Sequence, residues 1–441
     1  MAGGARPALG LSIGATNLAA VTADLAIVRK PVLTLYRQRP PEVGVPSENP
    51  RLDEPGRVIT DFVDRVGDPV GIVAADGSAH RSEALVADGL RALAYAATGG
   101  RPLPQSVAVT YPAHWSANAV VALGAALSRV AEWSNRARPL TLIPDAAAML
   151  FAVRANPGIP ARGTVAVCDF GGSGTSITLM DAAGGYQPVA PTVRHRDFCG
   201  DMVDQALLTA VMANMPSMGS SDASGTSAIG PLSRLRTGCR SAKEQLSSST
   251  VTTLTDELPG MPGDIRLTRN ELDAAIRAPL NSFVGMLDTT LSRNGIRDLV
   301  AVVSVGGGAN IPAVTTMLSG HFRVPVVTTP RPQLTAAIGG ALRAARGRGD
   351  SSPTALSPAA PQTAPTLVPL TRPARARSDV TATTKASSAL GLMPALAWAE
   401  AGYDSRAMTV GSGQRVAARN FERTQRRPSE PKTPVIPWYR R

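Results

Sequence analysis

Residues 168–176 read CDFGGSGTS and lie between two apolar runs, GTVAVCDF (163–170) and ITLMD (177–181). The apolar runs predict two buried strands joined by a short hairpin turn. Such a turn needs only one or two special residues, yet this one contains three glycines beside an acid, Asp169. Extra glycines in a strand connection are typical of a backbone that another group approaches closely. The stretch therefore predicts a strand pair whose turn receives a ligand.

Two further glycine turns follow apolar runs along the chain. We call the three, in chain order, the first, second and third glycine turns: 14–17 (Gly-Ala-Thr-Asn), 171–174 (Gly-Gly-Ser-Gly) and 306–308 (Gly-Gly-Gly). Each one alone is explained as an ordinary tight turn. Backbone N–H groups at such turns also form anion-binding concavities, and a strand–glycine–helix junction adds the positive end of a helix dipole. Two facing hairpin turns and one such junction would together clamp a nucleotide.

The composition indicates a large intracellular-type protein. The 441 residues imply two or three domains, and 44% apolar content supports a large core. Three widely separated cysteines form neither a disulfide framework nor a metal-binding spacing, so we expect a reducing, cytoplasmic setting. There is no signal-peptide pattern and no uncharged apolar window of about 18 residues, so we expect no transmembrane helix. High Ala, Gly and Arg content with little Lys fits a GC-rich bacterial genome.

The net charge of +12 is concentrated near the C-terminus. Residues 347–441 contain fourteen Lys/Arg and six Asp/Glu, a difference of +8. This segment is rich in Pro, Ala, Ser and Thr, and such a composition predicts a disordered basic tail. Its arginines are spread out and form no dense patch, which favours a solvated linker or a protein partner over nucleic acid or an anionic membrane surface.

Residues 1–346 alternate apolar strand-like runs with longer helical patterns, which is typical of the α/β class. We expect a helix over 116–133 with Ser116 as its N-cap. A Ser/Gly-rich loop is expected over 217–233, and a helical stretch over 269–295 is one helix or two.

The order and spacing of these segments resemble the nucleotide-binding domain of Hsp70 chaperones, within the actin/Hsp70/sugar-kinase superfamily. The resemblance covers residues 8–346, and its most specific patterns are RLRT and GGxxxIP. The segments that carry it are LGLSIGATN (9–17), VAVTYPAHWSANAVVAL (107–123), IPDAAAML (143–150), CDFGGSGTS (168–176), CGDMVD (199–204), RLRTGCRSAKEQLSSST (234–250), SVGGGANIP (304–312) and TAAIGGALRAA (335–345).

The resemblance implies an α/β chain with an actin-like ATPase fold, in which two lobes of ribonuclease-H-like mixed sheets with flanking helices surround a central nucleotide cleft. It implies a nucleotide-binding domain at 1–346, with lobes of about 1–160 and 161–346, and the tail at 347–441. No β-rich pattern like the Hsp70 substrate-binding domain follows residue 346, so we do not expect peptides to be gripped in the usual Hsp70 way.

On the resemblance, the cofactors are ATP or ADP with Mg²⁺. Asp169 would lie at the strand end facing the metal through water, which makes it the candidate catalytic and metal-binding acid. The residues that the resemblance places at the nucleotide are Gly14, Ala15, Thr16, Asn17, Gly171, Gly172, Ser173, Gly174, Gly200, Asp201, Lys243, Ser247, Gly306, Gly307, Gly308 and Asn310.

Several of these residues have a structural explanation as well. Asp169 would cap a turn through its side chain, and Lys243 would be a solvated surface lysine. Asp201 would cap a helix that starts at Met202, an interpretation that we slightly prefer to ligand contact. His114 is interpreted as a surface or packing residue.

The chain departs from the Hsp70 pattern at the acids that support hydrolysis, which hold Mg²⁺ and position the attacking water. The family's acid in the first phosphate loop falls on Ser12 of LGLSIGATN, and the acid of the first connecting helix falls on Ile143. A Thr and an Asp of the second phosphate loop fall on Gly174 and Ser176 of CDFGGSGTS, and a further Asp falls near Gln333. The family's catalytic lysine has no clear counterpart, although Arg65 lies in the right region of the sequence.

The adenosine-contacting segment is mixed. Lys243 and Ser247 match the family, whereas a Glu and an Arg are exchanged to Arg240 and Glu244. The arginine that stacks on adenine falls on Asn310, which cannot stack in that way.

These observations predict an Hsp70-like ATP/ADP-binding protein with weak or absent hydrolysis, a pseudo-ATPase that acts as a chaperone-like or regulatory switch. Two alternatives stay open: an active ATPase with rewired catalytic groups such as Arg65, and an interaction scaffold that binds no nucleotide and works through its basic tail. The sequence does not distinguish them.

Overall fold

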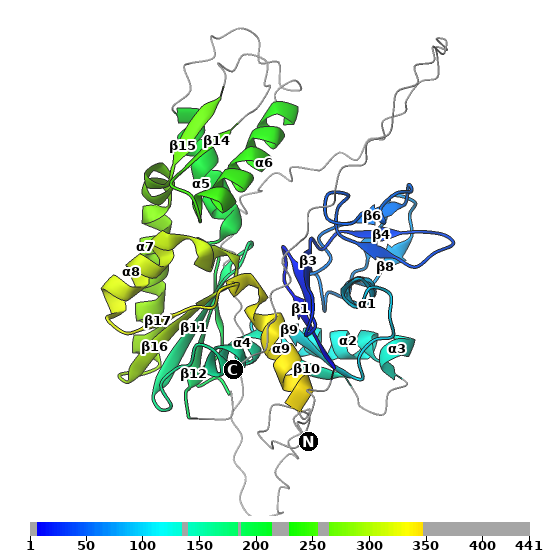
Figure 1. The fold of residues 1–441 in the computed structure, drawn as a ribbon, viewed down its shortest axis with the longest axis horizontal. Coiled ribbons are helices and arrows are strands. Elements are labelled where there is room, and N and C mark those ends of the chain that lie inside the picture. Colours follow the sequence, from blue (N-terminus) through cyan, green and yellow to red (C-terminus); the bar gives the residue numbers. More distant parts are fainter. Residues whose placement is uncertain (1–6, 135–139, 184–186, 214–228, 255–263, 347–441) are drawn as a thin grey trace, which may run out of the picture. The chain divides into compact units, whose positions relative to one another are not determined.

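The computed structural model describes residues 7–134, 140–183, 187–213, 229–254 and 264–346 (Figure 1). Within these ranges, strands and helices alternate as the α/β prediction requires, and two five-stranded sheets organise them. The predicted disorder of residues 347–441 lies outside the described residues.

The first sheet has the strand order β10-β9-β1-β2-β3. Strand β9 pairs in parallel with β1 and with β10. Strands β1, β2 and β3 form an antiparallel meander. All six residues of β9 are buried, as expected for a strand covered on both faces. The strands are β1 (Ala8–Ile13), β2 (Leu18–Val21), β3 (Ala26–Arg29), β9 (Ser106–Tyr111) and β10 (Thr141–Pro144).

The second sheet repeats this topology. Its order is β13-β12-β11-β16-β17, again with an antiparallel meander of three strands beside two parallel ones. In each sheet the hairpin between the first two strands of the meander contains a glycine turn, so the strand pair predicted over 163–181 is confirmed. The strands are β11 (Thr164–Phe170), β12 (Thr175–Asp181), β13 (Val193–His195), β16 (Leu299–Val305) and β17 (Val326–Val327).

Helices α4 (Asp145–Ala155) and α9 (Thr335–Arg346) follow the last strand of each sheet and pack against one another (Figure 1). Their backbones touch at Gly339, where a Cβ would collide with the carbonyl group of Ala148. A Cβ on Gly10 of β1 would likewise collide with the backbone of Ala337 in α9. Glycine is needed at both places because any side chain would push the backbones apart.

Most of the remaining helices pack on strands or on one another. Ser116 caps α2 as predicted, with its Oγ accepting from the N–H of Ala119. This helix ends at Leu127, however, so the predicted helix over 116–133 is too long. The helices are α1 (Ser82–Thr98), α2 (Ala117–Leu127), α3 (Ala131–Ser134), α5 (Gly200–Ala213), α6 (Ile229–Leu246), α7 (Arg269–Arg293), α8 (Pro312–Phe322) and the 3₁₀ helices η1 (Gly307–Asn310) and η2 (Pro332–Leu334).

The helical stretch left open over 269–295 is one helix, α7. It starts with a capping box in which Thr268 and Glu271 exchange hydrogen bonds. Pro279 lies inside the helix without ending it, because leucine, isoleucine and phenylalanine side chains on one face are buried before and after it. The predicted loop over 217–233 is too long, since α6 already begins at Ile229; residues 214–228 lie outside the described residues.

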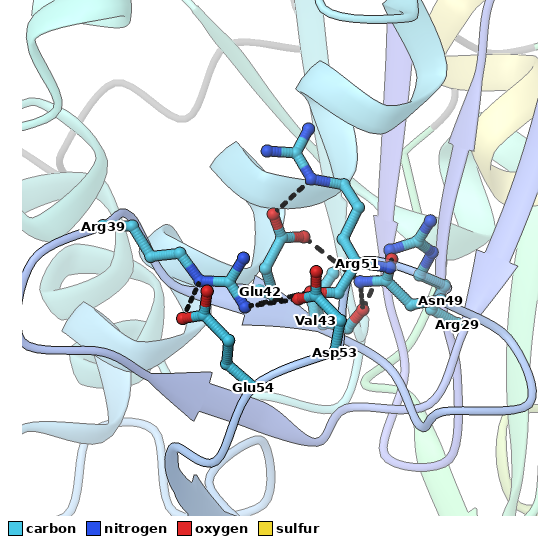
Figure 2. A network of polar contacts seen from close by, with 8 residues as sticks. All are labelled: Arg29, Arg39, Glu42, Val43, Asn49, Arg51, Asp53 and Glu54. Carbon is cyan, nitrogen blue, oxygen red and sulfur yellow. Dashed lines mark hydrogen bonds and ion pairs between the residues drawn. The ribbon is translucent and has the colours of Figure 1, made fainter.

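Three smaller sheets complete the described fold: β4 (Leu33–Leu35), β5 (Glu42–Val43) and β6 (Arg57–Ile59); β7 (Ile72–Val73) and β8 (Ala79–His80); and β14 (Val251–Leu254) and β15 (Ile265–Thr268). Figure 2 shows the polar network that holds the segment around β5. Buried Asn49 donates to the Glu42 carboxylate and to the Val43 carbonyl, and Arg29 also donates to Val43. Glu42 in turn pairs with Arg51 at 2.8 Å.

Candidate functional site

The first and second glycine turns touch each other. The backbone of Gly172 rests on the side chain of Thr16, and a Cβ at Gly172 would overlap its Cγ2 atom. Gly14 is similarly confined, since its Cβ would lie 2.9 Å from the Asn17 carbonyl oxygen. Two turns from different sheets therefore meet at one place, as two clamping loops would.

The third glycine turn closes on the end of β11. Gly306 has a φ of +82°, which glycine adopts freely. A Cβ on Gly306 would collide with Oδ1 of Asp169, and one on Gly308 would lie 2.9 Å from Cβ of Phe170. Asp169 thus lies between the second and third turns.

The Gly200–Asp201 segment is joined to the second turn through its backbone. The N–H of Gly200 donates to the Gly171 carbonyl at 3.0 Å, and that of Asp201 donates to the Gly172 carbonyl at 2.9 Å. Helix α5 begins at Gly200, so the expectation that Asp201 caps a helix starting at Met202 is wrong. Since the second turn supplies backbone acceptors, the start of this helix needs no side-chain cap.

Lys243 of α6 is not a solvated surface lysine. Its amino group pairs with Asp204 of α5 at 2.7 Å and donates to the Gly200 carbonyl at 3.1 Å. Both side chains of the pair are nearly buried, at 12% and 4% exposure. Burial raises the pKa of Asp204, while the Lys243 charge lowers it. The pair joins α5 to α6 and holds a cation next to the second turn.

Ser247 and Asn310 have partners within the protein. The Ser247 hydroxyl donates to the Lys243 carbonyl at 3.1 Å, one helical turn before it. The Asn310 amide donates to the Gly307 carbonyl at 3.1 Å and to Gln333 at 3.3 Å. Asn310 therefore braces the third turn against the segment that leads into α9.

The structure shows the contacts of two positions where the sequence departs from the Hsp70 pattern, Ile143 and Arg65. Ile143 is only 2% exposed and packs with Ala146 and other apolar residues of α4 and the second sheet. Arg65 forms an ion pair with Asp68 at 3.4 Å, and both side chains are more than a third exposed.

Asp145, the first residue of α4, is a site residue that sequence reasoning missed. It is buried, and its Oδ1 accepts from the N–H groups of Ala113 at 2.9 Å and Ala146 at 2.6 Å. Burial and the neighbouring Asp169 carboxylate raise the pKa of Asp145. Burial also raises the pKa of half-buried Asp169, while Arg194 lowers it. The Asp169 carboxylate therefore disfavours the charged form of Asp145.

Arg194 is the second residue that was missed. It stands on β13 directly across from Ser176 on β12. Its Nη1 donates to the Ser176 hydroxyl at 3.1 Å, and its Nη2 donates to the Ser173 hydroxyl at 3.0 Å. The guanidinium fills the space where a side chain on Gly174 would stand, since a Cβ there would lie 2.5 Å from Nε.

His114 belongs to the same cluster. Its Nδ1 lies 3.4 Å from the Ser176 hydroxyl, and the residue is half-buried. Burial and the charges of Arg194 and Arg196 lower the pKa of His114 to about 4, so the imidazole is neutral near pH 7. The interpretation of His114 as only a surface or packing residue is therefore incomplete.

The cysteines take no part in this chemistry. All three are buried and free. Cys168 precedes Asp169, and burial strongly raises the pKa of its thiol. Within the described ranges, no group of three or more His, Cys, Asp or Glu side chains is placed to hold a metal ion.

Two similar sheets whose glycine hairpins face one another define the actin-like class of ATPase folds. A family model described as Hsp70 protein matches residues 143–370, just over half of the chain. This chain belongs to the Hsp70 family.

Individual relatives agree with this family. A heat shock cognate HSP70 protein of Trypanosoma brucei brucei is 30% identical over 224 residues, which cover 48% of this chain and 32% of that protein. A chaperone protein HscA homolog of Acidithiobacillus ferrooxidans is 28% identical over 206 residues, covering 46% and 31%. A ribosome-associated molecular chaperone of Eremothecium gossypii is 32% identical over 186 residues, covering 41% and 29%. The chain spans about a third of the length of the curated relatives it matches.

A search of the described helices for membrane-spanning segments found none with sufficient length and hydrophobicity.

Proposed function

We propose that the chain binds ATP and ADP at its three glycine turns and acts as a chaperone-like nucleotide switch with weak or absent hydrolysis. The observation that carries this proposal is the convergence of the turns: Gly172 rests on Thr16, and Gly306 closes on Asp169. Backbone N–H groups at such turns bind phosphate whatever the neighbouring side chains are.

The lysine on α6 supports the adenosine side of this proposal. Lys243 is held beside Gly200 and the second turn by its pair with Asp204. Its position follows from the RLRT segment, which matches the family's adenosine-contacting helix. We propose that Lys243 contacts the ribose of the nucleotide and that Asn310 replaces adenine stacking by an edge contact.

The side chains at the positions of the family's acids support slow hydrolysis. Ile143 is buried among apolar residues and cannot accept a proton or hold a metal-bound water. Ser176 and Gly174 bring no carboxylate to the second turn. General acid–base groups contribute about 10²- to 10⁴-fold each in rate, so losing more than one of them leaves little ATPase activity.

One observation favours a second candidate, an ATPase with rewired catalytic groups. Asp145 lies beside Asp169, and the raised pKa values of this pair suit a general base near neutral pH. In this candidate the carboxyl pair, and not Arg65, would activate the attacking water.

Calorimetric titration of the full chain with ATP and ADP in Mg²⁺-containing buffer, together with a steady-state ATPase assay, tests the proposal. We expect Kd values of about 1–100 μM, or −8 to −5 kcal/mol, and turnover at least about 10²-fold below that of an active Hsp70 assayed in parallel. Absence of binding at millimolar nucleotide would overturn the proposal. Turnover within about tenfold of the active Hsp70 would favour the rewired ATPase, and loss of that turnover in Asp145→Asn would identify its base.

A partner for the tail remains a separate proposal. Residues 347–441 carry a net charge of +8 by sequence, which suits an acidic protein surface. Deletion of these residues should abolish capture of such a partner without changing nucleotide affinity.

A further inference from the structure

We propose that Arg194 is the phosphate-binding cation of this site and replaces Mg²⁺ as the counter-charge for the nucleotide, so that ATP and ADP bind without a divalent cation. This inference rests on the proposed nucleotide binding.

The guanidinium is fixed against the turn that would hold the phosphates. Two serine hydroxyls, those of Ser173 and Ser176, accept from it at 3.0 and 3.1 Å. These bonds use two of the five N–H groups of an arginine. The group is half-buried and oriented from two sides, so it needs little further ordering to donate to a phosphate oxygen.

Three features of the second turn are consistent with such a role. Gly174 leaves room for the guanidinium, because any side chain at this position would overlap it. Ser176, directly across from Arg194 in the sheet, holds the group by a neutral hydroxyl. A carboxylate at position 176, as the Hsp70 resemblance implies for the family, would form an ion pair with Arg194 and cancel its charge. The serine keeps that positive charge available for an anion.

The same residues do not suit Mg²⁺. This ion prefers near-octahedral oxygen ligands and usually one or two carboxylates. The carboxylates that feel the charge of Arg194 are Asp169 and Asp145, and Oδ1 of Asp145 already accepts two backbone N–H groups. Within the described ranges, no three His, Cys, Asp or Glu side chains are grouped so that they could hold a metal ion. The charge of Arg194 acts on both carboxylates, so it would also repel a dication placed between them.

An arginine can neutralise the phosphate charge in place of the metal ion. Its planar fork donates two parallel hydrogen bonds to a phosphate and keeps its charge at any physiological pH. Hydrogen bonds to charged groups contribute about 1.5–3 kcal/mol, which corresponds to about 10- to 150-fold in Kd.

The test is calorimetric titration of the full chain with ADP and ATP, in Mg²⁺ and again in EDTA, for the wild type and three variants. Arg194→Ala removes the cation, Arg194→Lys keeps charge without the fork, and Arg266→Ala is a matched control that removes an exposed strand arginine of β15. We expect the wild-type Kd to change by less than about threefold in EDTA. We expect Arg194→Ala to weaken binding by about tenfold or more in both buffers, Arg194→Lys to be intermediate, and Arg266→Ala to match the wild type.

Wild-type binding that requires Mg²⁺ would overturn this inference and leave the proposed function intact. Absence of wild-type binding in either buffer would overturn both. If Arg194 serves only to hold β13 to the second turn, Arg194→Ala will lower the thermal unfolding temperature without weakening the binding of ADP, and the inference fails. If Arg194→Ala does not fold, two measurements still test the inference: the wild-type Kd in Mg²⁺ compared with that in EDTA, and the Kd of the Arg194→Lys variant.

Discussion

Asp145 and Asp169 are two carboxyl groups that the fold holds close together beside one guanidinium. Bringing both negative charges out of water costs free energy, and the Asp169 charge also disfavours the charged form of Asp145. Both pKa values are therefore raised relative to an unfolded chain. The native state binds protons more tightly than the unfolded state, so the stabilisation from this pair is full below the ordinary carboxyl range and is lost as pH rises through the raised native values.

We predict that Asp145→Asn changes the pH dependence of stability. Asn can keep the oxygen that accepts from Ala113 and Ala146 but removes the repulsion with Asp169. Relative to the wild type, the variant should gain about 1 kcal/mol, or roughly 2–4 °C in Tm, between about pH 5 and pH 8. Thermal unfolding across this pH range measures the difference. Asp24→Asn, which removes an exposed carboxyl group, is the control variant. A difference that is flat with pH for Asp145→Asn would refute the charge coupling.

Some residues of the candidate site were predictable from the sequence and others were not. The glycine turns were predictable because turn chemistry is local, and the Hsp70 resemblance supplied their ligand. Arg194 was not predictable, because no motif surrounds it in the sequence. It reaches the second turn only because the strand register places it across from Ser176. Asp145 lies inside a quoted motif, IPDAAAML, but its importance depends on its neighbour Asp169, which lies on β11 and is distant in the sequence. Arg194 could have been found by pairing the strand after the second glycine hairpin with the next strand of the sheet, because that register places Arg194 opposite Ser176.

Among the elements, the close packing of α4 against α9 is a contact that sequence analysis did not foresee. The segments were predicted as helical, but the touching backbones at Gly339 and Gly10 follow from tertiary packing. Helix α7 gives the opposite lesson. Its Pro279 favoured a break, since proline removes a helix hydrogen bond, yet the buried face on both sides of it keeps the helix whole.

We predict that Gly339→Ala destabilises the protein. The added Cβ collides with the Ala148 carbonyl, and overpacking of this kind costs about 1–3 kcal/mol. Gly285→Ala in α7 is the matched control, because it is also a helical glycine but faces open space. It should be neutral or stabilise by up to about 1 kcal/mol. Chemical denaturation of both variants tests the pair; equal stabilities would mean that α4 and α9 are not packed backbone to backbone.

At the scale of the whole described domain, the same sheet topology occurs twice, and each copy contributes one hairpin to the glycine turns. This duplication was implied by the Hsp70 resemblance and is seen in the strand orders. A ligand that contacts the first and second turns together binds parts of both sheets at once. Its binding free energy therefore adds to the unfolding free energy of the described domain.

We predict that ADP raises the thermal unfolding temperature of the full chain. At a free concentration of about 100 times Kd, the native state gains about 2.7 kcal/mol. Differential scanning fluorimetry with increasing ADP measures the shift, and the titration should be repeated in EDTA. Gly172→Val, whose side chain would wedge the second turn away from Thr16, should show no shift. A shift in that variant equal to the wild type would mean that ADP binds elsewhere.

The crossing of α4 and α9 has a further consequence. Where two backbones lie in contact, there is no layer of side chains that can slide or change rotamer to absorb a displacement. A displacement of α4 at the point where Gly339 meets Ala148 would therefore have to move α9 with it. In mechanical terms, the crossing is a stiff joint between the helix that follows the first sheet and the helix that follows the second.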